Sequence, residues 1–380
     1  MRIAMISEHS GAGGRHVNDL SAALVRAGHD VTVYRRKNAR GLLAEEVAPE
    51  GYRLVHVPVG PAKRLAEDEI LPHIARFTRF VARHWRENPP EVVHSHFWLW
   101  GLAGVFATRG QQIPTVHTFH SLGTVKRRHE GAVVAERVQM ERLVGRSVTR
   151  LVATCSDEVA ELRRMGIRPE RVTVIPPGVD CGRFRPEGPA EPAKRLPHRV
   201  VTVGGPTPAS GLGDLVAALR GSPDAELVIV GDAGSDVSTL ATDLGVTDRV
   251  RFAGQVPRDR MPALLRSADL VACAPWYEAS GQEPIEAMAC GVPVLATAVG
   301  GLTDTVVDGV TGALVPPRRP GALATAMRTL LADPLKREFL GATGRDRAES
   351  RYPWDRIAAD TTRVYTGCAA PADTLVISGT

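Results

Sequence analysis

Short apolar runs, most of them rich in β-branched residues, alternate with stretches of helical periodicity along the whole chain. Runs that are apolar at nearly every position are typical of strands in parallel sheets, which helices cover on both faces. The strands predicted in this way are Ile3–Ile6, Val31–Tyr34, Arg53–Val57, Val92–His94, Thr115–Thr118, Leu151–Thr154, Val172–Ile175, Val200–Val203, Leu227–Val230, Val250–Phe252, Leu270–Ala274, Val294–Ala296 and Ala313–Val315. The pattern predicts an α/β protein with two Rossmann-like, parallel-sheet domains that face each other across a cleft.

A stretch rich in proline, glycine and charge interrupts this alternation and is typical of a linker. We place the first domain at residues 1–180, the linker at 181–198 and the second domain at 199–351. In the remaining residues, 352–380, the segment Tyr352–Tyr365 has amphipathic spacing, which predicts a helix that could pack back on the first domain.

The composition of the 380-residue chain narrows the class of protein. Its 47 basic and 42 acidic residues leave a net charge of +5, which suits an anionic small molecule and does not require nucleic acid. The five cysteines form no C-x-x-C pair, which argues against a zinc site or a disulfide framework and favours a reducing compartment. We find neither a signal-peptide core nor an apolar run long enough to span a membrane, and expect a soluble, cytoplasmic protein.

The segment from Trp276 to Val294, WYEASGQEPIEAMACGVPV, carries the strongest chemical signal. Glu278 and Glu286 stand with seven residues between them, and the second glutamate opens an apolar helical run. A buried helix has no structural need for a carboxylate in its first turn. Such carboxylates, together with free backbone amides at the helix N-terminus, would instead bind a hydroxyl-rich or anionic ligand.

A second candidate is the glycine loop SGAGG at residues 10–14, which follows the first strand. It could be a tight strand-to-helix turn, or a cradle for an anion at a helix N-terminus. A dinucleotide site is a weaker alternative, because His16 replaces the third glycine of the fingerprint and no acidic residue ends the second strand. Arg35 and Arg36, which stand there, would suit the 2′-phosphate of NADP.

Together these motifs resemble those of the family 4 retaining glycosyltransferases, which have the GT-B fold, and the resemblance covers nearly the whole chain. EAMACGVPV is its most specific part, within a segment that matches the family's E-x7-E motif. The other matching segments are GHDVTV at 28–33, VVHSHFWLWG at 92–101, TVHTFHSLG at 115–123, IPPGVD at 175–180, RVRFAGQV at 249–256, GG at 300–301 and VVDGVTGALV at 306–315. The resemblance implies an N-terminal acceptor domain and a C-terminal nucleotide-sugar domain.

The resemblance also implies roles for individual residues. Glu278 would bind hydroxyls of the donor sugar, and Glu286 would accept hydrogen bonds from the ribose. His120 would reach the donor sugar near the reacting centre, so His120 and Glu278 are the residues that we expect to be catalytic. The further donor-binding positions are Gly13, Gly14, Gly205, Ser210, Val256, Ser280, Gly281 and Gln282.

Enzymes of this family usually lack a protein nucleophile, and the leaving phosphate itself is thought to deprotonate the acceptor on the same face of the sugar, which gives retention. The residue types fit this chemistry, because carboxylates accept hydrogen bonds from vicinal hydroxyls and helix N-termini stabilise the charge of a leaving diphosphate. We expect no cofactor, and a nucleoside diphosphate sugar as co-substrate, in first place a UDP-sugar that carries a hexose or an aminosugar.

The chain departs from the family in the segment that grips the donor diphosphate. Family members usually carry G-R-x-x-x-x-K-G after the first strand of the second domain, but Gly205 and Ser210 stand here in place of the arginine and the lysine. Each charge-assisted hydrogen bond to a phosphate contributes ~1.5–3 kcal/mol. Losing two would weaken donor use by orders of magnitude unless something compensates.

Three explanations are open. Arg15, beside the glycine loop, or the cluster Lys126-Arg127-Arg128 could replace the missing cations. Alternatively, a specialised enzyme tolerates slow turnover, or the protein is a non-catalytic sugar-nucleotide-binding partner of an active enzyme. The intact E-x7-E motif and His120 argue against a decayed site.

The acceptor site would lie in the first domain, where eleven of the twelve histidines precede the linker. Several of them cluster after neighbouring strands, but no H-x3-H or H-E-x-x-H pair supports a metal, and we expect none. His96 could contact the acceptor. Trp98 could pack in a core or form an apolar platform under a sugar or cyclitol ring. The cluster Lys126-Arg127-Arg128 could be a solvated helix start, or could bind an acceptor phosphate or carboxylate.

Our main hypothesis is a retaining glycosyltransferase that moves a hexose or aminosugar to a small polar acceptor. The arginine- and alanine-rich composition resembles that of high-GC actinobacterial proteins, which favours natural-product or antibiotic biosynthesis with an aminocyclitol or aminoglycoside acceptor. The alternatives are an inositol phosphate or lipid-linked acceptor, and the non-catalytic partner. The sequence is compatible with a homodimer.

Overall fold

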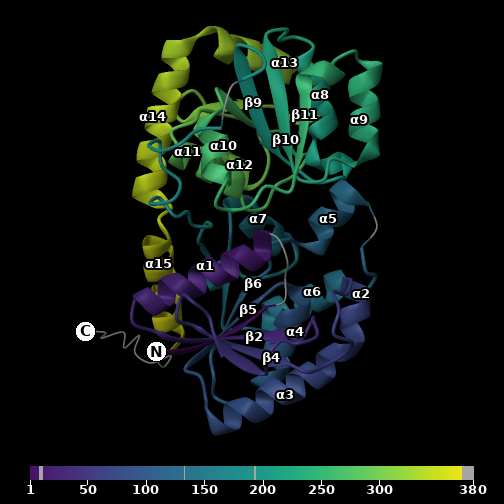
Figure 1. Ribbon diagram of the computed structural model, residues 1–380. Helices are drawn as coiled ribbons and strands as arrows, with labels where there is room; N and C mark the ends of the chain where they lie inside the picture. Colours follow the sequence, from purple (N-terminus) through teal and green to yellow (C-terminus); the bar gives the residue numbers. More distant parts are fainter. Residues whose placement is uncertain (8–11, 132, 192–193, 370–380) are drawn as a thin grey trace, which may run out of the picture.

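The computed structural model describes residues 1–7, 12–131, 133–191 and 194–369, and it shows two domains stacked along the long axis of the molecule (Figure 1). Each domain is built on one sheet with helices packed against it. The loops that follow the strands of the two sheets meet at the junction between the domains. Ligands of open parallel sheets bind beyond these carboxyl ends, so the junction is where a site is expected.

The N-terminal domain has a sheet in the order β3-β4-β2-β1-β5-β6-β7-β8. The strands are β1 (Arg2–Ile6), β2 (Asp30–Arg36), β3 (Glu45–Val47), β4 (Arg53–Val57), β5 (Val92–His96), β6 (Thr115–Thr118), β7 (Arg150–Ala153) and β8 (Val172–Val174). The α-helices are α1 (Ala12–Arg26), α2 (Glu67–Ile70), α3 (Ile74–Glu87), α4 (Trp98–Ala107), α5 (Gly123–Glu130), α6 (Arg137–Ser147) and α7 (Ser156–Arg164).

The C-terminal domain has a parallel sheet in the order β11-β10-β9-β12-β13-β14. The strands are β9 (His198–Val203), β10 (Ala225–Val230), β11 (Val250–Gly254), β12 (Leu270–Cys273), β13 (Val294–Thr297) and β14 (Gly312–Val315). The α-helices are α8 (Leu212–Leu219), α9 (Gly234–Asp243), α10 (Met261–Arg266), α11 (Gln282–Ala289), α12 (Gly301–Thr305), α13 (Pro320–Ala332) and α14 (Pro334–Arg351).

The predicted strands are all present, with ends that differ by a few residues. The apolar pattern does not predict β3, because Glu45 and Glu46 interrupt it. This short strand pairs antiparallel with β4 at the edge of the sheet, where charged residues are common and discourage pairing with other chains.

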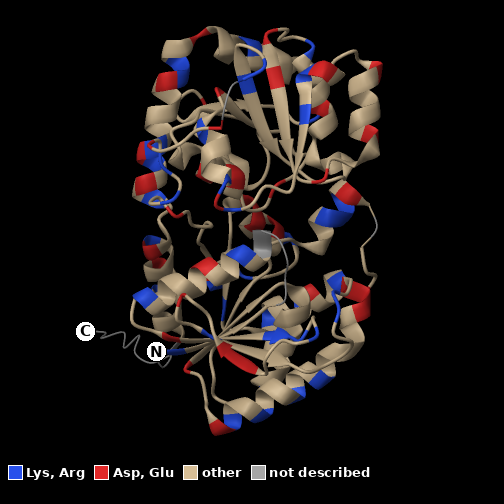
Figure 2. Ribbon diagram, in the orientation of Figure 1, with Lys and Arg blue, Asp and Glu red and all other residues tan. Residues whose placement is uncertain are grey.

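Both faces of the central strands are buried, which explains why those strands are apolar throughout. In β9, for example, Val200 packs in the same cluster as Leu215, whereas Val201 packs with Ile285 on the opposite face. Charged residues of both signs lie along the outer helices such as α3 and α14 (Figure 2). None of the described helices is long and apolar enough to cross a membrane.

The last described helix, α15 (Trp354–Ala369), returns from the C-terminal domain and packs against α1 of the N-terminal domain (Figure 1). Arg26 of α1 donates to Asp355 over 2.8 Å. The Tyr365 hydroxyl lies 2.7 Å from His94 Nδ1. The amphipathic segment at the end of the chain thus belongs to the core of the first domain.

Hydrogen bonds also join the facing loops of the two domains. Ser156, at the start of α7, donates through both its amide and its hydroxyl to Asp304 of α12, over 2.6 Å each. Thr154 Oγ1 donates to the Ala279 carbonyl over 2.9 Å. The described structure is therefore a closed arrangement in which side chains of both domains reach the same space.

Candidate active site

The loop between β12 and α11 presents Glu278 at the domain junction. Its carboxylate accepts from the Ser280 amide over 2.8 Å and from the Ser280 hydroxyl over 2.9 Å. Gly281 begins the helix with a φ of +65°, and a side chain at Gly300 would lie 2.1 Å from the Glu278 carbonyl. These glycines allow the tight approach that holds Glu278 in a fixed position, as a binding carboxylate requires.

Glu286 lies in α11, one helical turn after Gln282, and is 6% exposed. Its Oε1 accepts from Arg258 Nη1 over 2.5 Å and from Gln282 Nε2 over 3.2 Å. The Arg258 guanidinium also stacks on the Phe184 ring, 4.4 Å from its centroid. Arg258 was not among the predicted site residues, although it lies only two positions after the predicted Val256.

A third carboxyl group, Glu283, occupies the first turn of α11 between the two predicted glutamates. Burial raises the pKa of Glu283 to about 8, and the charges of Glu278 and Glu286 add to this rise, while Arg15 opposes it. The Glu283 carboxyl is therefore protonated at neutral pH. This proton reduces the negative charge at a helix end that would otherwise repel a diphosphate.

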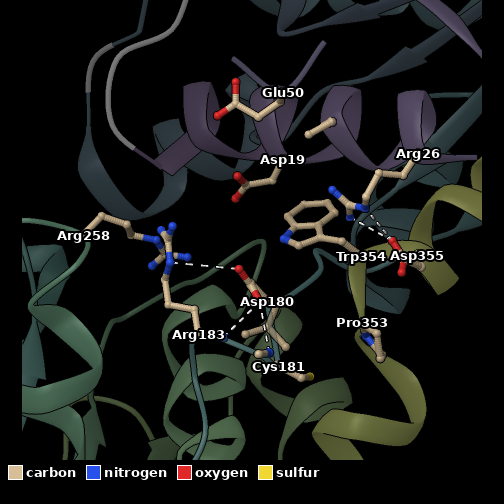
Figure 3. Close-up of a pocket in the computed structure, with 13 residues that line it drawn as sticks. Asp19, Arg26, Glu50, Asp180, Cys181, Arg183, Arg258, Pro353, Trp354 and Asp355 are labelled. Carbon is tan, nitrogen blue, oxygen red and sulfur yellow. Dashed lines mark hydrogen bonds and ion pairs between the residues drawn. The ribbon is translucent and has the colours of Figure 1, made fainter. Parts of the chain in front are cut away.

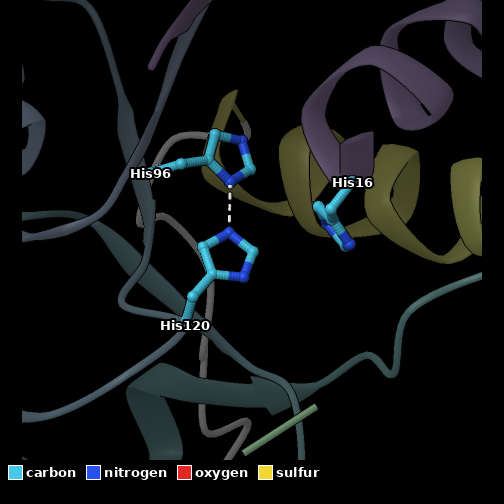
Figure 4. A group of neighbouring side chains, drawn as sticks. All are labelled: His16, His96 and His120. Atoms are coloured by element: carbon cyan, nitrogen blue, oxygen red, sulfur yellow. Dashed lines mark hydrogen bonds between the residues drawn. The ribbon is translucent and has the colours of Figure 1, made fainter. Parts of the chain in front are cut away.

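Three histidines from separate elements meet on the N-terminal side of the junction (Figure 4). His96 ends β5, His120 follows β6 and His16 lies in the first turns of α1. His96 Nδ1 is 3.0 Å from His120 Nε2, and the His16 ring meets the His120 ring edge-on with centroids 4.9 Å apart. Burial lowers the pKa of His16 to about 4 and that of His96 well below its usual range, so both rings are neutral.

One nitrogen from each of these three rings lies within 4.8 Å of the other two, a spacing at which neutral imidazoles could bind a metal ion. The pair formed by His96 and His120 instead satisfies its facing nitrogens by a mutual hydrogen bond. His16 was not predicted as a member of the site, because it appeared only as a replacement in the glycine loop.

The two residues predicted to be catalytic, His120 and Glu278, line one pocket of about 200 Å³. They come from opposite domains, as a transfer between two substrates requires. Lys126 and Glu130 of α5 line the same pocket and form an ion pair at 3.8 Å. Ala209 lies on the opposite wall, next to Ser210 of the segment that lacks the expected cations.

Gly205 and Ser210, at the two positions where the family's arginine and lysine would stand, are uncharged. Ser210 Oγ donates to the Thr207 carbonyl over 2.7 Å. Gly205 borders space in which an added Cβ would meet no described atom within 4 Å. Arg15 is exposed in the first turn of α1 and acts electrostatically on Glu283, which makes it a nearby cation of the donor side.

Two other predicted residues, Arg128 and Trp98, do not line this pocket. Arg128 turns to Glu161 and pairs with it over 3.1 Å, so it does not share the pocket of Lys126. Trp98 is 1% exposed and donates to Glu67 over 3.1 Å. This placement corrects the platform hypothesis, because a buried indole cannot lie under an acceptor ring; the alternative of core packing holds.

His96 is 0% exposed, which likewise leaves no surface for direct acceptor contact.

Val256 is partly buried and packs against the core of the second domain after β11. Arg127 lies on α5 between Lys126 and Arg128. Gly13 and Gly14 both lie in the first turn of α1. The surroundings of Gly13, and residues 10 and 11 of the glycine loop, lie outside the part of the chain that the structure describes.

A larger cavity of about 530 Å³ opens between α1 and the segment that joins the domains (Figure 3). Arg183 and Arg258 point into it from the second domain's side, and Asp19 faces them from α1. Burial raises the pKa of Asp19, and Arg258 partly offsets the rise. Because Arg258 bonds to Glu286, this cavity adjoins the carboxylate predicted to bind ribose.

Comparisons with known proteins agree with this geometry. The model of the glycosyl transferase 4-like domain matches residues 11–178, and that of glycosyl transferases group 1 matches residues 191–347. The D-inositol 3-phosphate glycosyltransferase of Xylanimonas cellulosilytica is 34% identical over 96% of both chains, and that of Salinispora tropica is 35% identical over 96% of this chain and 85% of its own. The structure of sucrose-phosphate synthase from Thermosynechococcus elongatus superposes with a TM-score of 0.86 at 29% identity, covering 96% of this chain and 98% of that one. The chain therefore belongs to the family 4 glycosyltransferases of the GT-B fold.

Proposed function

We propose that this glycosyltransferase moves a sugar from a UDP-sugar to a phosphorylated cyclitol, with retention of the sugar's configuration. The observation that carries the proposal is the pocket that His120 of one domain and Glu278 of the other both line. The acceptor class is supported by the D-inositol 3-phosphate glycosyltransferases, which are similar over almost the whole chain.

The donor would lie along the N-terminus of α11. Glu278 is held by its own loop, and in the proposal its carboxylate accepts from sugar hydroxyls. Glu286 is oriented by Arg258 and Gln282 and accepts from the ribose. The N-terminus of α11 would face the diphosphate, which gains charge as the bond to the sugar breaks.

The acceptor would enter through the pocket that Lys126 lines. No described side chain is placed as a nucleophile under this proposal: the leaving phosphate takes the acceptor's proton, and His120 orients the donor sugar. The neutral state of the neighbouring His96 and His16 keeps positive charge from accumulating there. Lys126 would bind the acceptor phosphate once its exposed ion pair with Glu130 opens, which costs little because such pairs are weak.

One observation favours an aminocyclitol as a second candidate acceptor. Glu130 lies in the same pocket as Glu278, and Arg128, which would strengthen a phosphate site, is paired with Glu161 instead. A pocket with two carboxylates and one lysine could accept an ammonium group as readily as a phosphate. A phosphorylated acceptor would be bound by Lys126, whereas an acceptor with an ammonium group would be bound by Glu130.

The test is to measure UDP release with a panel of UDP-sugars and two acceptors, inositol 3-phosphate and 2-deoxystreptamine. We expect release with inositol 3-phosphate, and a rise in its KM of ~10-fold or more in Lys126→Gln but not in Glu130→Gln. The opposite pattern, with 2-deoxystreptamine as the active acceptor, would favour the second candidate. Absence of release with every pair, while UDP still binds, would support a non-catalytic partner.

A further inference from the structure

The rings of His96 and His120 lie next to each other and share a hydrogen bond (Figure 4). The two facing nitrogens are 3.0 Å apart, and the rings are nearly parallel, with an interplanar angle of 23°. Since His96 is 0% exposed, it can influence a ligand only through His120.

The backbone around this pair is held in unfavourable conformations. His120 has a φ of +59°, and Phe97, the residue after His96, has a φ of +66°. Residues other than glycine reach this region only at an energetic cost, and such strain concentrates at functional sites. The Phe97 ring also stacks on His120, with centroids 4.6 Å apart. Strained backbone, which lowers the stability of the fold, thus lies on both sides of the hydrogen bond between His96 and His120.

A buried line of contacts supports His96 from behind. The His94 ring contacts the His96 ring, with centroids 4.1 Å apart and the ring planes tilted by 33°. His94 is itself fixed at both nitrogens, by the Tyr365 hydroxyl over 2.7 Å and by Thr118 Oγ1 over 2.9 Å. Through this line the C-terminal helix α15 braces the ring that touches His120.

We propose that His96 is a positioning residue for glycosyl transfer: its Nδ1–H donates to His120 Nε2 and so fixes the orientation of His120 and places that ring's proton on Nδ1. This inference rests on the proposed function, in which His120 contacts the donor sugar. His96 then acts through His120, in place of the direct acceptor contact that the sequence suggested.

The choice of tautomer follows from the surroundings of the second nitrogen of His96. Burial keeps this ring neutral, so it carries one proton. His96 Nε2 is buried and has no hydrogen-bond partner among the residues that the structure describes. Buried N–H groups without an acceptor are rarer than buried acceptors without a donor. The proton of His96 therefore belongs on Nδ1, between the two rings, and His120 Nε2 accepts it.

The test compares His96→Asn with His96→Leu, because the asparagine amide can donate from near the position of Nδ1 and leucine cannot. We expect His96→Leu to lower kcat ~10- to 100-fold with KM for the donor within about 3-fold, and His96→Asn to recover most of kcat. The matched control is His117→Asn, which removes another fully buried histidine, one that bonds to Ser95 over 2.9 Å. It should leave kcat unchanged.

The second measurement is independent of activity. In protein labelled with 15N in its histidine rings, the ring shifts of His120, identified by their loss in His120→Gln, should report a proton on Nδ1. A proton on Nε2, or equal kcat losses in His96→Asn and His96→Leu, would overturn the proposal. Loss of activity on chelation with recovery by Zn²⁺ would overturn it too, because the rings would then bind an ion rather than each other. If the wild type turns over no donor, the proposed function fails, while the ring shifts still decide the tautomer.

Discussion

Glu283→Gln should stabilise the protein at alkaline pH and leave its stability in acid unchanged. Burial and the charge of Glu278 raise the pKa of Glu283 from 4.5 to about 8 in the folded state. The folded protein therefore holds a proton that the unfolded chain releases above pH 4.5. The stability associated with this group is fully present below pH 4.5 and is lost as the pH rises through 8.

The size of the effect follows from the shift in pKa. A difference of about 3.5 pK units corresponds to an upper limit of about 5 kcal/mol, at 1.36 kcal/mol per unit. Because Glu283 is partly exposed, solvent screens the ionised form, and we expect ~2 kcal/mol at pH 8.5. Glutamine has the shape of a protonated glutamate, so the substitution removes the cost of ionisation and little else.

Urea unfolding at pH 4, 6.5 and 8.5 measures this difference directly. The free energy of unfolding of the variant should exceed that of the wild type by an amount that grows with pH. Glu338→Gln is the matched control, since Glu338 is an exposed glutamate on α14. A difference that is the same at all three pH values would refute the reasoning, because it would come from volume or packing rather than from a proton.

Three further predictions concern the site. Gly205 has open space beside it, so Gly205→Arg should tighten UDP binding ~10-fold or more, as measured by calorimetry. The uncharged control Gly205→Gln should not, and equal affinities of the two variants would show that the segment does not lack a charge. Asp304→Asn weakens the 2.6 Å contacts with Ser156 and so favours an arrangement in which the two domains are further apart. The KM for the donor should rise several-fold and the radius of gyration in solution should increase; an unchanged radius would contradict this. Glu278→Gln should lower kcat ~100-fold while UDP still binds, and unchanged turnover would remove its assigned role.

The sequence pattern was sufficient for every strand except β3 and for the loop that carries Glu278. Both depend on signals that are local in the chain: continuous apolar runs, and carboxylates at a helix start next to glycines. That His120 and Glu278 share a site was predicted from the resemblance to the family and not from a local pattern, because they follow strands of two different sheets and meet only where the two domains face each other.

Residues whose role depends on contacts between distant segments were missed. Arg258 matters because it reaches Glu286, and Asp19 because α1 faces the second domain; neither stands in a recognisable motif. Trp98 shows the opposite error: an indole after a strand suggested a ligand platform, but Glu67 satisfies its N–H inside the core. Glu283 could have been found, since a charged residue between two site glutamates in an apolar run is a local signal.

The return of α15 to the first domain has a consequence for how the protein is made. Trp354, Ile357 and Tyr365 fill a core shared with β1 and α1, which the ribosome completes more than three hundred residues earlier. Until the end of the chain emerges, that apolar surface has no cover, and His94 lacks its Tyr365 partner. A fragment that ends at residue 180 should therefore aggregate or bind chaperones, and the N-terminal domain acquires its final form only after the C-terminal domain has been synthesised.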